Sequence, residues 1–147
     1  MKNNHHKVFF VQKLGEGEFD TEALWCIKAN DDLYVVDNIP FIAKRVSLGD
    51  TIKAEYDKDD KAYYFDDFVA VSGNTTVRLY FEDDSSIESV RKELSDLGCE
   101  SEVLLQKKIL AVNVPSSIEY KPIKEFLEMG EQKHKWEYEE SCLAHKY

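Results

Sequence analysis

The sequence predicts an α+β fold in which a small antiparallel β-sheet or open barrel is followed by a ferredoxin-like βαββαβ half. Over residues 1–74, apolar and polar side chains alternate with a period of two and no helical pattern occurs, which is typical of short antiparallel strands. Residues 75–147 instead give the order strand, helix, strand, strand, helix, strand. We therefore expect a β-rich subdomain, 1–74, and a ferredoxin-like subdomain, 75–147; the sequence leaves open whether they share one core.

The first half divides into short strands joined by tight turns. Alternation predicts strands over residues 8–14, 23–29, 33–37, 51–56 and 62–72. Gly15-Glu16-Gly17, Asn30-Asp31-Asp32 and the polar run 57–61 have the composition of turns between them. Short strands in this arrangement favour a small curled sheet or an open barrel.

The second half contains two segments with helical spacing. The first carries an apolar stripe at Ile87, Val90, Leu94 and Leu97, and Gly98 follows where a helix C-cap belongs. Ser85-Ser86-Ile87-Glu88 has the spacing of a capping box at its start.

The second helical segment is expected to begin at Pro122 and to end at Gly130, because proline suits a first helical position and glycine a terminus. Strands are predicted over residues 76–81, 99–105, 109–114 and 134–140. In the last of these, Trp136 and Tyr138 should face inward.

The net charge is −10, from 19 basic and 29 acidic side chains, and each half of the chain carries −5. An acidic field of this kind repels phosphate backbones and attracts basic surfaces. The composition therefore argues against nucleic-acid binding and favours a positively charged protein partner.

No stretch approaches the roughly 18 apolar residues of a membrane span, and the N-terminus lacks a signal-peptide pattern. The three cysteines, Cys26, Cys99 and Cys142, have unrelated spacings that imply no disulfide framework. We expect a cytoplasmic protein with reduced thiols, no membrane association and no cofactor.

Acidic residues interleaved with tyrosine form the candidate binding surface, because tyrosine adds rigid contact area and a face that attracts cations. Three acidic groups occur, one in the turn 57–61, one on the strand after it and one at the end of the strand 76–81. If these ends lie close in space they make one negative patch, which Tyr56, Tyr63, Tyr64 and Tyr80 could border. The predicted partner-binding residues are Asp57, Asp59, Asp60, Tyr63, Tyr64, Asp66, Asp67, Glu82, Asp83 and Asp84. The alternative interpretation of these carboxylates is a solvated, solubilising face.

Catalytic motifs are weakly supported, so the protein is predicted not to be an enzyme. Cys142 and His145 are close enough in sequence for a thiolate and an imidazole to pair or to share a metal, with His134 as a further ligand. A zinc site with strong sequence support would show two closely spaced ligand pairs, which this chain lacks.

Six short segments together resemble the bacterial family called domain of unknown function 4265. They are 24–26 (LWC), 37–41 (DNIPF), 46–50 (VSLGD), 72–78 (SGNTTVR), 111–115 (AVNVP) and 136–140 (WEYEE). The resemblance spans nearly the whole chain and implies a fold and a bacterial origin, but little chemistry.

Two functions are consistent with these observations. The first is an immunity protein that binds and neutralises a basic bacterial toxin domain, in particular a nuclease, by charge-complementary occlusion. The alternative is a small-molecule-binding regulatory module, or an enzyme using Cys142, His145 and His134, on the ferredoxin-like half.

Overall fold

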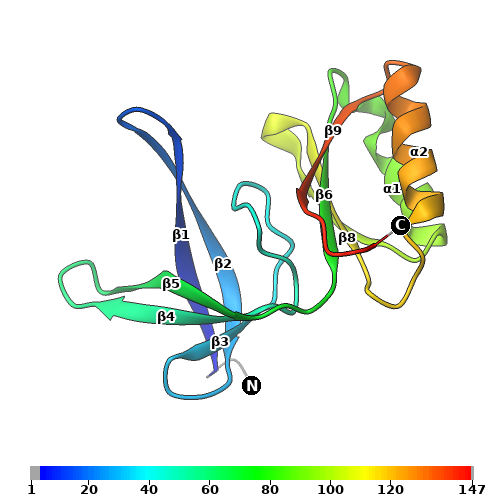
Figure 1. Ribbon diagram of the computed structural model, residues 1–147. Helices are drawn as coiled ribbons and strands as arrows, with labels where there is room; N and C mark the ends of the chain where they lie inside the picture. Colours follow the sequence, from blue (N-terminus) through cyan, green and yellow to red (C-terminus); the bar gives the residue numbers. More distant parts are fainter. Residues whose placement is uncertain (1–3, 147) are drawn as a thin grey trace. The chain divides into compact units, whose positions relative to one another are not determined.

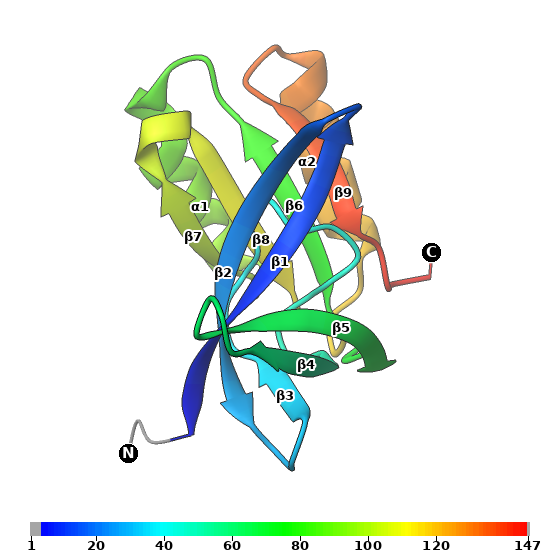
Figure 2. The same cartoon turned by 90° about the vertical axis from the view of Figure 1, so that its left-hand side faces the viewer.

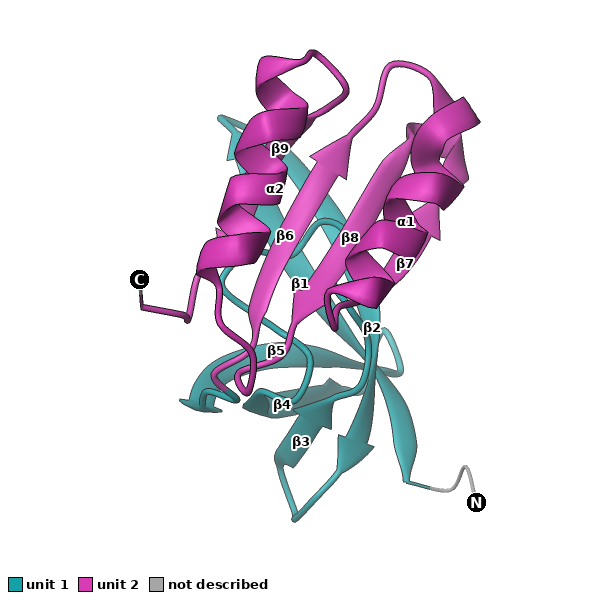
Figure 3. Ribbon diagram, turned by 90° about the vertical axis from the view of Figure 1, so that its right-hand side faces the viewer, with its two compact units in different colours: residues 1–72 teal, residues 73–147 magenta. Residues whose placement is uncertain are grey.

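The computed structural model describes residues 4–146, which form two compact units divided between Ser72 and Gly73 (Figure 3). The boundary between the units follows Ser72, whereas the sequence predicts it two residues later, after residue 74. Each unit has its own cluster of buried apolar side chains.

Unit 1 is a closed five-stranded barrel with strand order β1-β2-β3-β4-β5 (Figure 1). Its strands are β1 (His5–Gly15), β2 (Glu18–Lys28), β3 (Leu33–Val36), β4 (Thr51–Asp57) and β5 (Ala62–Ala70). Neighbours in sequence pair in antiparallel fashion, as alternation predicts. The barrel closes through a parallel contact of β1 with β5, at Val8 opposite Tyr63 and Phe9 opposite Tyr64.

Period-two alternation decides which side chains of unit 1 point inward. Val8 and Phe10 of β1 meet Leu24 and Cys26 of β2 in the core, and all four are at most 2% exposed. The intervening residues of both strands face outward because successive strand side chains point to opposite faces. Beyond Phe9, β1 and β2 continue as a two-stranded hairpin past the other strands of the unit (Figure 2).

Two carboxylates hold the long connection between β3 and β4 in place. Glu22, on the inward face of β2, accepts backbone N–H bonds from Phe41, Ile42 and Ala43, each at 2.8 Å. At the end of the connection the buried Asp50 accepts N–H bonds from Ser47 at 2.9 Å and Ser72 at 2.8 Å. These charged acceptors give a segment without regular structure a defined path.

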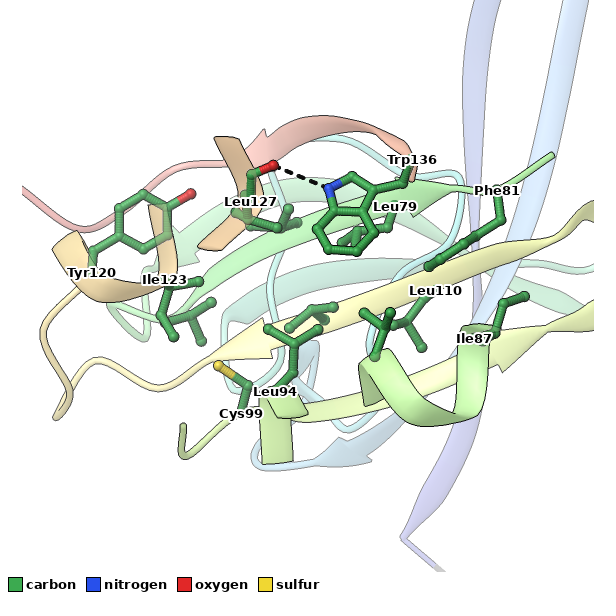
Figure 4. Packing of buried hydrophobic residues seen from close by; sticks show 14 residues of the cluster. Leu79, Phe81, Ile87, Leu94, Cys99, Leu110, Tyr120, Ile123, Leu127 and Trp136 are labelled. Atoms are coloured by element: carbon green, nitrogen blue, oxygen red, sulfur yellow. Dashed lines mark hydrogen bonds between the residues drawn. The ribbon is translucent and has the colours of Figure 1, made fainter. Parts of the chain in front are cut away.

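Unit 2 confirms the ferredoxin-like βαββαβ prediction. Its elements are β6 (Thr75–Tyr80), α1 (Ile87–Asp96), β7 (Glu100–Leu104), β8 (Ile109–Val114), α2 (Lys121–Gln132) and β9 (Glu137–Cys142). The sheet order is β7-β8-β6-β9, so β8 lies between the two strands that α1 connects. Both helices cover one face of this sheet, and their apolar stripes meet Leu79, Leu110 and Val112 in a common core (Figure 4).

The boundaries of α2 and β9 differ from the prediction. Helix α2 continues past Gly130 to Gln132, and β9 begins at Glu137 rather than at residue 134. Gly130 is instead the site where the ring of Trp136 packs, since a Cβ on Gly130 would lie 1.9 Å from Trp136 Cζ2. Trp136 is 5% exposed, and its indole N–H donates to the carbonyl of Leu127 (Figure 4).

The start of α1 also differs from the expected capping box. Asp83 accepts an N–H bond from Ser85 and begins a 3₁₀ turn, Asp84–Ser86, which leads directly into α1. Ser86, at the N-cap position, makes no capping bond with its side chain. Gly98 follows α1 with a φ of 98°, as expected for the residue after a helix C-cap. Neither helix in residues 4–146 is long and apolar enough to cross a membrane.

Candidate functional site: an acidic hairpin tip

The hairpin of β4 and β5 ends in a cluster of exposed carboxylates with the exposed Tyr56 and the half-buried Tyr64. We call Glu55, Tyr56, Asp57, Asp59, Asp60 and Tyr64 the acidic tip. The strand register places Glu55 opposite Tyr64, so these two side chains share the outer face of the barrel. A cavity of about 310 Å³ lies among Glu55, Tyr56, Asp57 and Tyr64.

Hydrogen bonds give the acidic tip a defined shape. One carboxylate oxygen of Asp57 accepts the N–H groups of Asp59 at 2.9 Å and Asp60 at 3.1 Å. Tyr64 donates its hydroxyl proton to Asp60 at 2.9 Å, and this bond, followed by slight burial and the charge of Asp60, raises the pKa of Tyr64. Asp57 therefore shapes the turn, and the hydroxyl of Tyr64 fixes the carboxylate of Asp60.

The other residues predicted on this hairpin lie elsewhere. Tyr63 points inward, where its ring contacts those of Tyr34 and His6, at centroid distances of 5.7 Å and 5.2 Å. Asp66 and Asp67 are exposed further along β5, and Asp67 lies opposite Lys53 of β4. Asp66 falls at a register shift in the ladder. Of the seven predicted residues in unit 1, the structure thus brings together Asp57, Asp59, Asp60 and Tyr64.

Two of the three predicted residues of unit 2, Glu82 and Asp83, border a second acidic and aromatic surface. A cavity of about 530 Å³ is lined by Tyr80, Phe81, Glu82, Glu131, His134, Lys135, Trp136 and Glu137. Asp83 and Glu82 also line a neighbouring cavity of about 330 Å³. The N–H bond from Ser85 lowers the pKa of Asp83. Asp84 belongs to the 3₁₀ turn that follows.

Tyr80 contributes a charged hydrogen bond to this second surface. Its hydroxyl donates to Glu139 on the neighbouring strand β9, and Arg78 lies 3.8 Å from the same carboxylate. Burial, the hydrogen bond and the charge of Glu139 raise the pKa of Tyr80 to about 12, while Arg78 acts in the opposite direction.

The residues of the enzyme-like hypothesis do not converge. His134 precedes β9 and His145 follows it, so the two histidines lie at opposite ends of that strand. Both ring nitrogens of His145 are engaged, Nδ1 with Thr75 Oγ1 at 2.6 Å and Nε2 with the carbonyl of Pro115 at 2.9 Å. Among residues 4–146, no group of three His, Cys, Asp or Glu side chains is arranged to hold a metal ion.

The geometry of Thr75 also assigns the tautomer of His145. Thr75 Oγ1 accepts N–H bonds from Ala144 at 3.0 Å and His145 at 3.1 Å, which occupy both of its lone pairs. Its hydroxyl proton is therefore donated to Nδ1, and Nε2 carries the proton that bonds the Pro115 carbonyl. The bonds of His145 to Thr75 hold the segment after β9 against β6.

Glu55 was absent from the predicted site, although the alternation that places Asp57 on the outer face also places Glu55 there. Phe9 was missed as well. The centroid of its ring lies 5.6 Å from that of Tyr64, and the parallel closure of the barrel creates this contact. No local sequence pattern predicts it.

Unit 1 and unit 2 together define an α+β protein with a closed β-barrel and a split βαβ sheet, in which each unit bears an acidic surface with aromatic neighbours. The chain belongs to the family described as a domain of unknown function (DUF4265), whose model matches residues 22–138. A crystal structure described as that of a hypothetical protein from Neisseria gonorrhoeae is similar, with a TM-score of 0.82, 24% sequence identity and coverage of 97% of each chain. That similarity concerns the fold. None of the curated proteins matches the chain.

Proposed function

We propose that this chain is an immunity protein that binds a basic bacterial toxin domain, in particular a nuclease, and covers its nucleic-acid-binding surface. The observation that carries the proposal is the acidic tip, where four carboxylates and two tyrosines gather at one hairpin end. Two of these carboxylates, Glu55 and Asp57, and both tyrosines line a cavity of about 310 Å³. A nuclease needs a basic surface to hold its substrate, and carboxylates in a defined arrangement can occupy it in place of phosphates. Such a protein would act in the cytoplasm, where the toxin meets its substrate.

The chemistry of the acidic tip suits guanidinium and ammonium groups. Carboxylates accept charge-assisted hydrogen bonds from arginine, and tyrosine rings attract cations through their faces. Hydrogen bonds of Asp57 and Tyr64 already order the acidic tip before a partner binds. Binding would therefore cost little conformational entropy at the tip. Electrostatic attraction would also raise the association rate.

A growth assay tests the proposal directly. Proteins encoded by the genes beside this one are expressed in a bacterium with and without this chain, and binding is measured with the purified pair. We expect one basic product to arrest growth, the chain to restore it, and the pair to bind. If no neighbouring product is toxic, or if a toxic one neither binds nor is neutralised, the proposal is wrong.

Two variants of equal net charge test the role of the acidic tip. The first combines Glu55→Gln, Asp57→Asn, Asp59→Asn and Asp60→Asn, which retain hydrogen-bond acceptors. The control combines Asp31→Asn, Asp96→Asn, Glu100→Gln and Glu125→Gln, four exposed acids of other elements. We expect the tip variant to associate roughly tenfold more slowly with a weaker salt dependence, and the control to change much less. Equal rates for the two variants would exclude a local role for the tip.

A cavity in unit 2 supports a second candidate function, the binding of a small anionic molecule. It has a volume of about 680 Å³, and its lining includes Lys121, Lys146, His145 and the single acid Glu119. Two lysines in one cavity of a chain with net charge −10 would favour a phosphate or a carboxylate. Inorganic phosphate and citrate should then raise the melting temperature, and Lys121→Gln/Lys146→Gln should remove that shift. No shift with either anion would rule out this candidate.

A further inference from the structure

The outer face of the β1–β2 ladder carries large apolar side chains that the core does not use. Register places Phe9 opposite Ala23, Val11 opposite Thr21 and Lys13 opposite Phe19, all on the outer face. Four side chains of this face are strongly exposed: Ile27 38%, Trp25 45%, Val11 49% and Phe19 62%. Exposed apolar side chains gathered on one face are typical of an interaction site.

Trp25 is the most distinctive member of this face. Its exposure is unusual for the largest apolar side chain, and tryptophan is enriched among residues that dominate binding energy at interfaces. A cavity of about 500 Å³ beside it is lined by His5, Trp25, Asp37 and Asn38. Lys7 lies 5.2 Å from the centroid of the Trp25 ring, so this ring already takes a cation from its own chain.

Acidic groups border the apolar row at two places. At its base, Asp37 lies in the cavity beside Trp25 and binds His5 at 3.1 Å. In its middle, the ring of Phe9 lies 5.6 Å from that of Tyr64, which joins the row to the acidic tip. An apolar centre with a charged border is the usual anatomy of a specific protein interface; Lys7 and Lys13 lie on this face as well, so its negative border consists of the acidic tip and Asp37.

We propose that the outer β1–β2 face, formed by Phe9, Val11, Phe19, Trp25 and Ile27, is the apolar centre of the interface with a basic partner protein. The inference rests on the proposed function and specifies its surface: the partner presents apolar side chains flanked by arginine or lysine. Its apolar groups cover Trp25, Val11 and Phe19, while its cations reach the acidic tip and Asp37. Charge alone would then bring the partner close, and the apolar row would hold it.

Peptide probes separate the apolar contribution from the charge contribution. Calorimetry compares (Arg-Phe)₄ with (Arg-Ser)₄, which has the same charge, and with (Glu-Phe)₄, which has the opposite charge. Acrylamide quenching of tryptophan fluorescence reports the covered face, since of the two tryptophans Trp25 is exposed and Trp136 is buried. We expect (Arg-Phe)₄ to bind about tenfold more tightly than (Arg-Ser)₄, with (Glu-Phe)₄ weakest, and to protect Trp25 from quenching.

Surface variants assign the effect to this face. Val11→Ser/Phe19→Ser should reduce the affinity for (Arg-Phe)₄ to that for (Arg-Ser)₄, with an unchanged melting temperature because both residues are exposed. Leu105→Ser removes a side chain of similar exposure, 57%, from unit 2 and should have no effect. The four-residue tip variant should reduce the affinities for both arginine peptides by the same factor.

Five outcomes would overturn the inference. Equal affinities for the two arginine peptides, or an unchanged affinity after Val11→Ser/Phe19→Ser, would remove the apolar centre and leave the charge-based function standing. Equal affinities for (Arg-Phe)₄ and (Glu-Phe)₄ would exclude a preference for a basic partner. If sedimentation shows a dimer that Val11→Ser/Phe19→Ser dissociates, the occupant is a second copy of this chain. Failure of both arginine peptides to bind would reject the inference together with the proposed function.

Discussion

Trp136 and Gly130 show how one residue pair orders the end of unit 2. The indole ring occupies the position where a side chain on Gly130 would stand, and it contacts the rings of Phe81 and Phe126 at centroid distances of 5.8 Å and 5.4 Å. The bond from its N–H to Leu127 satisfies the one polar group of the ring. Gly130 lowers the helix propensity of α2, and the packing of the Trp136 ring against it offsets this loss.

Gly130→Ala tests this packing. In an exposed helix the change would stabilise by up to about 1 kcal/mol, because alanine is the better helix former. Here the added Cβ would lie 1.9 Å from Trp136 Cζ2, so we expect a loss of about 3 kcal/mol or more in the free energy of unfolding. Urea denaturation measures the loss, with Gly15→Ala as control, where an added Cβ meets nothing within 4 Å. A stabilised Gly130→Ala variant would contradict the packing described here.

At the scale of elements, the connection between β3 and β4 depends on one side chain of β2. Glu22→Ala removes the acceptor of three N–H bonds from residues 41–43, at 2.8 Å each. We expect a loss of about 2–3 kcal/mol in unfolding free energy and faster amide exchange at these residues, because hydrogen bonds to a charged acceptor are among the stronger ones. Glu22→Gln retains one side-chain carbonyl oxygen as an acceptor, so its loss of unfolding free energy should be smaller.

Hydrogen exchange followed by NMR decides whether the effect is local. Thr21→Ala, on the outward face beside Glu22, is the matched control and should leave exchange at residues 41–43 unchanged. Unaltered exchange in Glu22→Ala would show that the connection holds its path without the carboxylate.

Elements set by local spacing were predictable, and those set by long-range contacts were not. Alternation is enough to identify β1 to β5, and a stripe every three or four residues is enough for α1. The parallel closure at Val8 and Phe9 was not foreseeable, because it joins residues more than 50 positions apart. Gly130 was misread because terminal glycines and glycines under a packed ring look alike in sequence.

The candidate site follows the same rule. Asp57, Asp59 and Asp60 belong to one turn, so their proximity follows from local composition. Tyr63 and Tyr64 were assigned together, although neighbours on a strand face opposite sides and only Tyr64 can join the acids. Whether Glu82, Asp83 and Asp84 act with them depends on tertiary structure, which alternation does not encode.

At the scale of the whole molecule, buried thiols and phenols make stability sensitive to high pH. Burial, and then the charge of Asp37, raises the pKa of Cys26 from 9.0 to about 12, and burial raises that of Cys99 to about 11. Burial, with smaller effects from Tyr63, raises the pKa of Tyr34 from 10.0 to about 12. Above about pH 9 the unfolded chain loses protons that the folded chain keeps, so stability falls as pH rises toward 12.

The unfolding free energy should therefore decline between about pH 9 and pH 12, by up to about 1.4 kcal/mol per pH unit for each retained proton. Urea midpoints measured at several pH values under reducing conditions give the slope. Cys26→Ala removes one titrating group and should make the slope shallower, whereas Cys142→Ala, at a partly exposed position, serves as control. Stability that is flat to pH 11 would contradict the burial of these groups.

The closure of the barrel by its first and last strands has a consequence for synthesis. Until Tyr63 and Tyr64 have left the ribosome, β1 lacks one of its two neighbours and its edge stays open to other chains. More than 50 codons must therefore be translated after β1 before the barrel of unit 1 can close. Folding that depends on contacts so distant in sequence is slow. During that interval the nascent chain would be a natural client for a chaperone.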